Sequence, residues 1–308
     1  TVRDVSLSVD KGDVLGIVGE SGSGKSQTMF SVMGLLSGNG IVKDGSITID
    51  GKEISPKAFS DRKEYEQVMD HIRGNDLAMI FQDPMTFLNP VLRIETQLME
   101  PILNHMDISK EEAKKRAIKL MRKVGIPSPE ARIRQYPHQF SGGQRQRIGI
   151  ARALAVKPEF LLCDEPISAL DVSIQAQVVN MLEDLQEELG LTYLFVAHDL
   201  SMVRHISTRI GVMYLGNMVE IGESSDLYHN PMHTYTKALL SAVPIPDPEI
   251  GKSKKRIVLQ GELPSPLDTP SGCVFRTRCP NATERCAREK PGMVNVGKRT
   301  VACFLYEK

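Results

Sequence analysis

The sequence contains no apolar run long enough to form a membrane-spanning helix. Such a helix needs about 20 consecutive apolar residues, and no stretch of the 308 residues approaches that length. A secretory signal peptide is also missing, because the opening TVRDVSLSVDKGD alternates like a strand and then turns. These absences predict a protein of the cytosol.

An excess of either charge is missing as well. Lys and Arg together number 38, and so do Asp and Glu, which gives no support to a nucleic-acid-binding surface. We therefore expect no nucleic-acid partner. Hydrophobic residues make up 41% and charged residues 25% of the chain, which is ordinary for a globular protein with a sizeable core.

Cysteine is scarce and unevenly placed. The chain has five cysteines, and both the odd number and a reducing cytosol argue against a disulfide framework. Cys163 lies in an apolar run and is expected to be a small core residue. The other four lie near the end of the chain, and their role depends on what precedes them.

Short apolar runs alternate with helical patterns along residues 1–243. Strands are expected in five runs, VLGIV, GSITIDG, DLAMIFQD, FLLCDEP and TYLFVAHD. A helix over residues 109–124 has Ser109 as its cap and Gly125 as its end, and a second helix over residues 173–189 ends at Gly190. This alternation predicts an α/β fold with a mostly parallel sheet.

The stretch GESGSGKS, residues 19–26, matches the phosphate-loop pattern G-x-x-x-x-G-K-[ST] between an expected strand and an expected helix. Its glycines let backbone N–H groups point inward around a phosphate, and the helix N-terminus adds positive potential. Lys25 would reach the β- and γ-phosphates, and Ser26 would ligate Mg²⁺. The predicted ATP-binding residues here are Gly19, Ser21, Gly22, Gly24, Lys25, Ser26 and Gln27.

A second candidate site follows much later, where FLLCDEP ends in Asp164 and Glu165. A carboxylate at the tip of a buried strand can hold Mg²⁺, and the next carboxylate can polarise an attacking water. The pair alone is weak evidence, but beside a phosphate loop it predicts ATP hydrolysis.

At this point the chain resembles the ABC-type ATPases. FSGGQRQR, residues 140–147, resembles their signature motif, SALD at 168–171 their D-loop, and IFQDP and VAHD their Q-loop and switch. The resemblance implies a RecA-like core with antiparallel β and α-helical subdomains, the helical one at about 84–155. It also implies a head-to-tail dimer in which each ATP meets the other subunit's signature. The implied residues are catalytic Glu165, His198 and Gln82, ATP-binding Ser141, Gly142, Gly143, Gln144 and Asp171, and Mg²⁺ ligands Ser26, Gln82 and Asp164.

The chain departs from that family at its start. Members usually carry an adenine-stacking aromatic about twenty or more residues before the phosphate loop, and none of Phe, Tyr or Trp stands among the eighteen residues before Gly19. Either the first strand has been trimmed, or adenine stacks on another side chain. Rival classes are soluble ABC ATPases of DNA or ribosomes, disfavoured without heptad runs or a second phosphate loop, and a non-enzymatic subunit, disfavoured because Lys25, Glu165 and His198 are present.

The C-terminal part narrows the resemblance. Residues 227–244 and 261–280 resemble the oligopeptide/dipeptide permease ATPase subunits, a group that includes nickel importers. The resemblance implies an ATP-hydrolysing subunit for peptide import, or alternatively for nickel or another solute, at the cytoplasmic face of the membrane. Its partners would be two transmembrane permease subunits, a second ATPase subunit (paralogue or self) and, indirectly, an extracytoplasmic peptide-binding protein.

The predicted domains are an ABC ATPase over residues 1–243 and a C-terminal extension over residues 244–308. Four cysteines separated by five, six and sixteen residues fit a four-thiolate metal site, although a disulfide pair or unconnected thiols remain open. The resemblance points to a structural or regulatory [4Fe-4S] cluster away from the ATP, with Zn²⁺ as the alternative. The predicted ligands are Cys273, Cys279, Cys286 and Cys303.

Overall fold

The structure is a computed structural model that describes residues 2–83, 87–243 and 256–307. The chain divides into two compact units. Unit 1 combines Thr1–Thr28 with Phe195–Lys308, and unit 2 is Met29–Leu194. Helix α1 (Lys25–Met33) and strand β6 (Thr192–Val196) each contain a boundary between the units.

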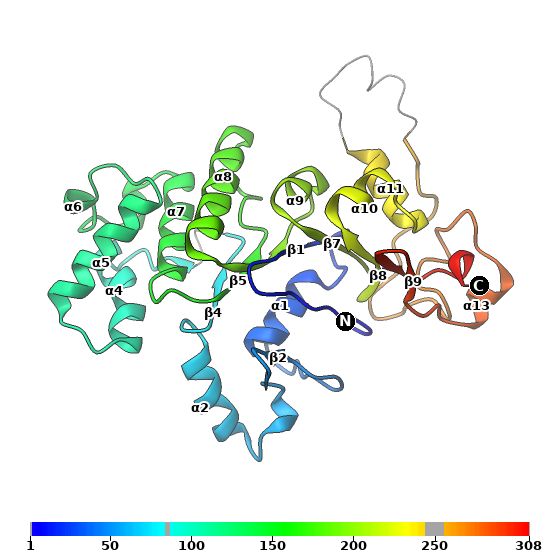
Figure 1. Cartoon of the computed structure of the whole chain (residues 1–308), viewed down its shortest axis with the longest axis horizontal. Helices are drawn as coiled ribbons and strands as arrows, with labels where there is room; N and C mark the ends of the chain where they lie inside the picture. Colours follow the sequence, from blue (N-terminus) through cyan, green and yellow to red (C-terminus); the bar gives the residue numbers. More distant parts are fainter. Residues whose placement is uncertain (1, 84–86, 244–255, 308) are drawn as a thin grey trace. The chain divides into compact units, whose positions relative to one another are not determined.

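Unit 1 is built on a mixed sheet whose strands follow the order β6–β1–β7–β8–β10–β9 (Figure 1). Strand β1 pairs in parallel with β7, and the later pairs are antiparallel. The side chains of β1 are all buried, which is typical of a strand covered on both faces. Besides β6, the strands of this sheet are β1 (Val14–Val18), β7 (Arg209–Tyr214), β8 (Asn217–Glu223), β9 (Val294–Val296) and β10 (Arg299–Val301).

The helices of unit 1 are short, and α9 packs against β1. A Cβ at Gly16 of β1 would lie 2.1 Å from Val203 Cγ1, so this helix requires a glycine beneath it. The helices are α9 (Leu200–Ile206), α10 (Ser224–His229), α11 (Thr234–Ala242) and α13 (Glu284–Arg288), with a 3₁₀ turn at Phe304–Tyr306.

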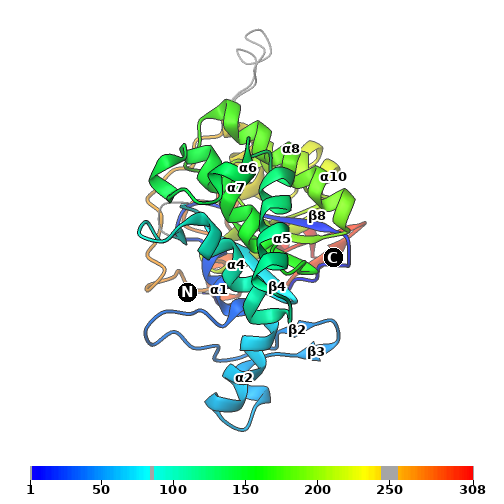
Figure 2. The ribbon, with the colours of Figure 1, turned by 90° about the vertical axis from the view of Figure 1, so that its left-hand side faces the viewer.

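Unit 2 carries a parallel strand pair and a group of helices. Strands β4 (Leu77–Ile80) and β5 (Phe160–Asp164) pair in parallel, and Thr192 at the start of β6 donates a backbone hydrogen bond to Glu159 beside β5. Helices α4, α5 and α7 contact one another, as Figures 1 and 2 show. The helices are α2 (Arg62–Ile72), α4 (Ile94–His105), α5 (Lys110–Lys123), α6 (Pro129–Arg132), α7 (Gly142–Ala153) and α8 (Val172–Leu189). Strands β2 (Thr48–Ile49) and β3 (Lys52–Glu53) form a small hairpin, and 3₁₀ turns span Pro56–Ala58 and Pro137–Gln139.

The two helices expected from local patterns are present. In α5, the Ser109 hydroxyl accepts from the Glu112 N–H, and the Glu112 carboxylate accepts from the Ser109 N–H in return. This reciprocal pair satisfies two N–H groups that a helix start otherwise leaves unbonded. Helix α8 ends at Gly190, whose φ of 64° lies in the left-handed region that favours glycine.

The C-terminal segment contributes to the sheet of unit 1, since β10 pairs with β8 through Thr300 and Val301. The predicted domain limits stay predictions. Residues 84–86, where the predicted helical subdomain begins, and residues 244–255, where the predicted extension begins, lie outside the described residues. In the described part of the chain, no helix combines the length and the apolarity needed to traverse a bilayer.

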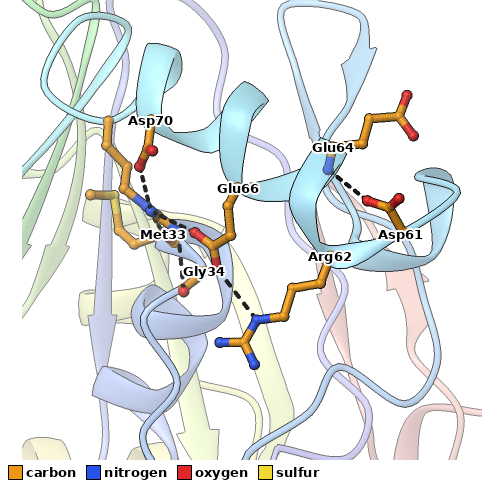
Figure 3. A network of polar contacts seen from close by, with 8 residues as sticks. Met33, Gly34, Asp61, Arg62, Glu64, Glu66 and Asp70 are labelled. Atoms are coloured by element: carbon orange, nitrogen blue, oxygen red, sulfur yellow. Dashed lines mark hydrogen bonds and ion pairs between the residues drawn. The ribbon is translucent and has the colours of Figure 1, made fainter.

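Arg73 holds the C-terminal end of α1. Its guanidinium donates to the backbone carbonyls of Met33 and Gly34 and pairs with Glu66 and Asp70 of α2. Figure 3 labels these four partners. A cation at this end satisfies carbonyls that the helix leaves unbonded and opposes the negative end of its dipole.

We expect Arg73→Ala to lower the free energy of unfolding by about 1–2 kcal/mol, because charged hydrogen bonds to carbonyl groups are lost. Arg62→Ala is the matched control, since Arg62 is 91% exposed and lies 3.9 Å from Glu66; its effect should stay within about 0.5 kcal/mol. Urea titration of both variants measures the difference. Equal losses would contradict the capping role of Arg73.

Candidate functional site

The phosphate loop has the predicted context, since residues 19–26 follow β1 and lead into α1. Gly19 is required by close packing: a Cβ there would lie 2.2 Å from the carbonyl oxygen of Met213. Gly22 and Gly24 adopt φ of 78° and 98°, a conformation that favours glycine. The loop curl therefore depends on these three glycines.

Lys25 is buried and lies over the loop. Its ammonium donates to the carbonyl oxygens of Gly19 at 2.8 Å and Glu20 at 3.2 Å. The backbone of the loop thus holds the charge of the Lys25 ammonium. Ser26 and Gln27 lie in the first turn of α1, where helix N–H groups favour anions.

His198 leaves the sheet beside the phosphate loop. The Ala197 N–H donates to the Ile17 carbonyl at 3.2 Å, so the carboxyl ends of β6 and β1 are adjacent within unit 1. His198 is exposed, and Asp199 caps α9 by accepting from the Ser201 N–H. Ligands of parallel α/β sheets bind at this kind of edge.

The register of two strands in unit 2 places Gln82 opposite Glu165. Ile80 of β4 pairs with Cys163 of β5, and each of the two polar residues stands two positions further on. The Gln82 amide Nε2 donates to Glu165 Oε2 at 3.1 Å. The structure therefore brings these predicted catalytic residues into contact.

Asp164 and Glu165 differ in environment. Asp164 is 3% exposed at the end of β5, whereas Glu165 is half-buried in the following turn. The φ of Glu165 is 44°, which is strained for a residue with a side chain, and its carbonyl accepts from both the N–H and the hydroxyl of Ser168. Burial raises the pKa of Cys163, as expected of a thiol in the core.

The signature residues form the N-terminus of α7. The Ser141 hydroxyl accepts from the Gln144 N–H, and the Gln144 side chain accepts from the Ser141 N–H. Ser141 and Gly142 are exposed. A Cβ at Gly143 would lie 2.7 Å from the Ile174 side chain, so α8 limits this position to a small residue. Asp171 stands exposed at the start of α8.

The chemistry of these groups fits Mg²⁺ with a nucleotide. Mg²⁺ takes one or two protein oxygen ligands and completes its shell with phosphate oxygens and water. The Asp164 carboxylate and the Gln82 amide in unit 2, and the Ser26 hydroxyl in unit 1, are side chains of the oxygen-donor types that Mg²⁺ accepts. When bound, Mg²⁺ would neutralise charge that develops on the phosphates.

The predicted iron–sulfur cluster is wrong, and so is its zinc alternative. Across the parts of the chain that the structure describes, no group of three or more His, Cys, Asp or Glu side chains is placed to hold a metal ion. Cys273, Cys279, Cys286 and Cys303 are half-buried free thiols. Burial raises the pKa of Cys273 to about 11 and also raises that of Cys303. Cysteine spacing alone was a misleading signal.

Two side chains outside the predicted nucleotide-binding set touch the phosphate loop. Arg278 forms an ion pair with Glu20, and the Tyr235 hydroxyl accepts from the Glu20 N–H. The C-terminal segment therefore contacts the phosphate loop through these two side chains. No local pattern could have found these contacts, because Arg278 lies 258 positions after Glu20.

The family comparison agrees with this geometry. The family described as "ABC transporter" matches residues 2–168, which include the phosphate loop, Gln82, the signature and Glu165. The chain belongs to the ABC transporter family. It is thus an ATPase of the ABC type with the α/β cassette fold, as predicted. A second family, "Oligopeptide/dipeptide transporter, C-terminal region", matches residues 219–286.

Individual relatives cover almost the whole chain. The oligopeptide transport ATP-binding protein OppF of Salmonella typhimurium is 48% identical over 98% of this chain and 87% of its own length. The oligopeptide transport ATP-binding protein AppF of Bacillus subtilis is 48% identical over 99% of this chain and 89% of its own length. Among solved structures, the dimeric ATP-binding cassette MJ0796 bound to ADP and Pi has a TM-score of 0.61 at 28% identity, covering 72% of this chain and 90% of that one.

We expect Gly19→Ala to abolish nucleotide binding, because the new methyl group would strike the Met213 carbonyl and distort the loop. Gly292→Ala is the matched control, since its Cβ would meet nothing within 4 Å. Calorimetric titration with MgATP measures affinity, and thermal unfolding checks that both variants fold. Unchanged affinity in Gly19→Ala would contradict the close-packing argument.

Proposed function

We propose that the chain is the ATP-hydrolysing subunit of an ABC importer for oligopeptides or dipeptides. One observation carries the proposal. An ABC cassette and the oligopeptide/dipeptide C-terminal region are joined in one chain that resembles oligopeptide transport ATP-binding proteins nearly end to end. The subunit acts with two transmembrane permease subunits and a second ATPase subunit, at the cytoplasmic face of the membrane.

The proposed domain organisation keeps the limits expected from the sequence. An ATPase cassette spans residues 1–243, with a helical subdomain at about 84–155, and an extension with the cysteine-rich segment follows at 244–308. The mutual contacts of α4, α5 and α7 support the helical subdomain.

The proposed chemistry assigns one role to each group. Lys25 and the N–H groups of the loop hold the β- and γ-phosphates, and Glu165 polarises the attacking water. The hydrogen bond from Gln82 occupies one oxygen of the Glu165 carboxylate and fixes the orientation of that side chain. His198 contacts the γ-phosphate, while Ser141, Gly142, Gly143, Gln144 and Asp171 act on the nucleotide of the partner subunit.

A largely apolar hollow in unit 2 supports the permease partner. Its volume is about 320 Å³. Phe81, which precedes Gln82, lines it together with Met79, Phe87 and Pro101. A hydrophobic helix end of a permease subunit fits such a hollow. Docking there would reach the glutamine that contacts Glu165, which links transport to hydrolysis.

The function is tested by reconstituting the chain with its permease subunits in liposomes. Peptide that is delivered by the extracytoplasmic binding protein should stimulate ATP hydrolysis. The peptide should then accumulate on the side of the liposome membrane opposite to the binding protein. If nickel ions stimulate ATP hydrolysis and peptide does not, the transported substrate is nickel and not peptide, and the role of the chain as the ATPase subunit is unchanged.

We expect Glu165→Gln to reduce turnover by at least about a hundredfold, because the water loses its polarising carboxylate. Binding of MgATP should persist, since the phosphate loop is unchanged. Glu159→Gln is the control, because Glu159 stands at the opposite end of β5. Phosphate release by the reconstituted complex measures turnover, and near-normal turnover in Glu165→Gln would exclude the assigned role.

A second variant tests the role of the signature across the dimer. Ser141→Arg should block ATP-dependent dimerisation, because a bulky side chain at an exposed helix start would obstruct the opposing nucleotide. Binding of MgATP to the monomer should change by less than about threefold. Light scattering measures dimerisation and calorimetry measures binding. Loss of monomer binding would argue against a role in trans.

A further inference from the structure

We propose that Arg278 is a positioning residue for the phosphate loop, through which the C-terminal region sets how tightly the chain binds nucleotide. The proposal rests on the function proposed above, since it requires residues 19–26 to be the nucleotide site. It adds a residue from the far end of the chain to that site.

The contact is a two-pronged ion pair. Arg278 Nη1 donates to Glu20 Oε2 at 2.7 Å, and Nη2 donates to Glu20 Oε1 at 3.2 Å. The two side chains are only 11% and 28% exposed. A paired fork of this kind fixes direction as well as distance, and its strength is little reduced by salt when water is largely excluded.

Glu20 is held at every polar group it has. Its N–H donates to the Tyr235 hydroxyl at 2.8 Å, its carbonyl accepts from the Lys25 ammonium at 3.2 Å, and its carboxylate accepts from Arg278. The Glu20 N–H is therefore engaged by a side chain.

An aromatic cluster places Arg278 at this position. Phe275 is 1% exposed, and its ring centroid lies 5.2 Å from that of Tyr214 and 5.5 Å from that of Tyr235. The Arg278 N–H donates to the Phe275 carbonyl at 3.0 Å, which closes a turn between them. Burial of Phe275 thus anchors the turn from which Arg278 extends to the loop.

The charge of Glu20 explains why an arginine is needed. A carboxylate within a loop that binds a polyphosphate repels its ligand, and the repulsion grows where water is excluded. Arg278 neutralises the charge of the Glu20 carboxylate, and its two hydrogen bonds keep that carboxylate in one orientation. Tyr235 and Arg278 both belong to residues 219–286, the part that matches the oligopeptide/dipeptide transporter C-terminal region.

The test measures the dissociation constant of MgATP for the purified full chain. We expect Arg278→Gln to weaken binding about tenfold, because Glu20 is left unpaired beside the phosphates. Adding Glu20→Gln to that variant should restore affinity to within about threefold of the parent chain, because the repelling charge is gone. Arg276→Gln is the matched control: Arg276 lies in the same turn, but its guanidinium donates to Ser271, so the affinity of this variant should stay within about twofold of the parent chain.

Two outcomes would overturn the proposal. Parent-like affinity in Arg278→Gln would remove the positioning role. Equal weakness in the single and double variants would assign the loss to disturbed packing of the C-terminal region. Should Arg278→Gln fail to fold by thermal unfolding, Arg278→Lys keeps the charge without the fork and should weaken binding about threefold; parent-like affinity there would also overturn the role.

A reference variant separates this proposal from the function on which it rests. Lys25→Ala should lose MgATP binding. Normal binding in Lys25→Ala would overturn the assignment of the nucleotide site itself, and the role of Arg278 with it. Lost binding in Lys25→Ala together with parent-like binding in Arg278→Gln would overturn the role of Arg278 alone.

Discussion

The conformation of the phosphate loop depends on contacts with groups outside the loop. A loop whose backbone N–H groups point toward a ligand lacks the regular backbone hydrogen bonds that stabilise a helix or a strand. Neighbouring backbone supplies part of the missing support. The Gly216 N–H donates to the Ser23 carbonyl at 2.8 Å, and the Met213 carbonyl packs where Gly19 has no side chain. An anion site made of backbone is thus shaped by the strand pair β7–β8 as much as by its own sequence.

The contact between Gln82 and Glu165 depends on the register of strands β4 and β5. A parallel pair fixes which residues emerge together at the carboxyl edge. Because Ile80 is paired with Cys163, Gln82 and Glu165 emerge side by side, and a shift of one strand by one residue would turn its side chain to the other face, away from its partner. Buried apolar side chains on β4 and β5 hold that register, so the core of unit 2 determines the geometry of the contact between Gln82 and Glu165.

Local sequence patterns predicted the local features of the fold and missed the long-range ones. The strand β1, the capped helix α5 and the glycine end of α8 follow from residues that lie within a few positions of one another. The contact of Arg278 with Glu20 and the pairing of β10 with β8 join distant segments, which no spacing rule encodes. The cysteine spacing failed for a related reason. A metal site depends on where thiols point and how deeply they are buried, and spacing fixes neither.

Helix α1 shows how these constraints combine. It has nine residues, which is too short for a helix that is stable by itself. Its first turn also lacks an acidic side chain that would stabilise the helix dipole. Arg278 acts on the loop that precedes it, and Arg73 donates to the carbonyls that end it. Arginine suits both tasks, because its planar fork makes two directed bonds from one side chain that remains charged at any physiological pH. The loop before α1 and the C-terminal end of α1 are therefore each contacted by an arginine from elsewhere in the chain.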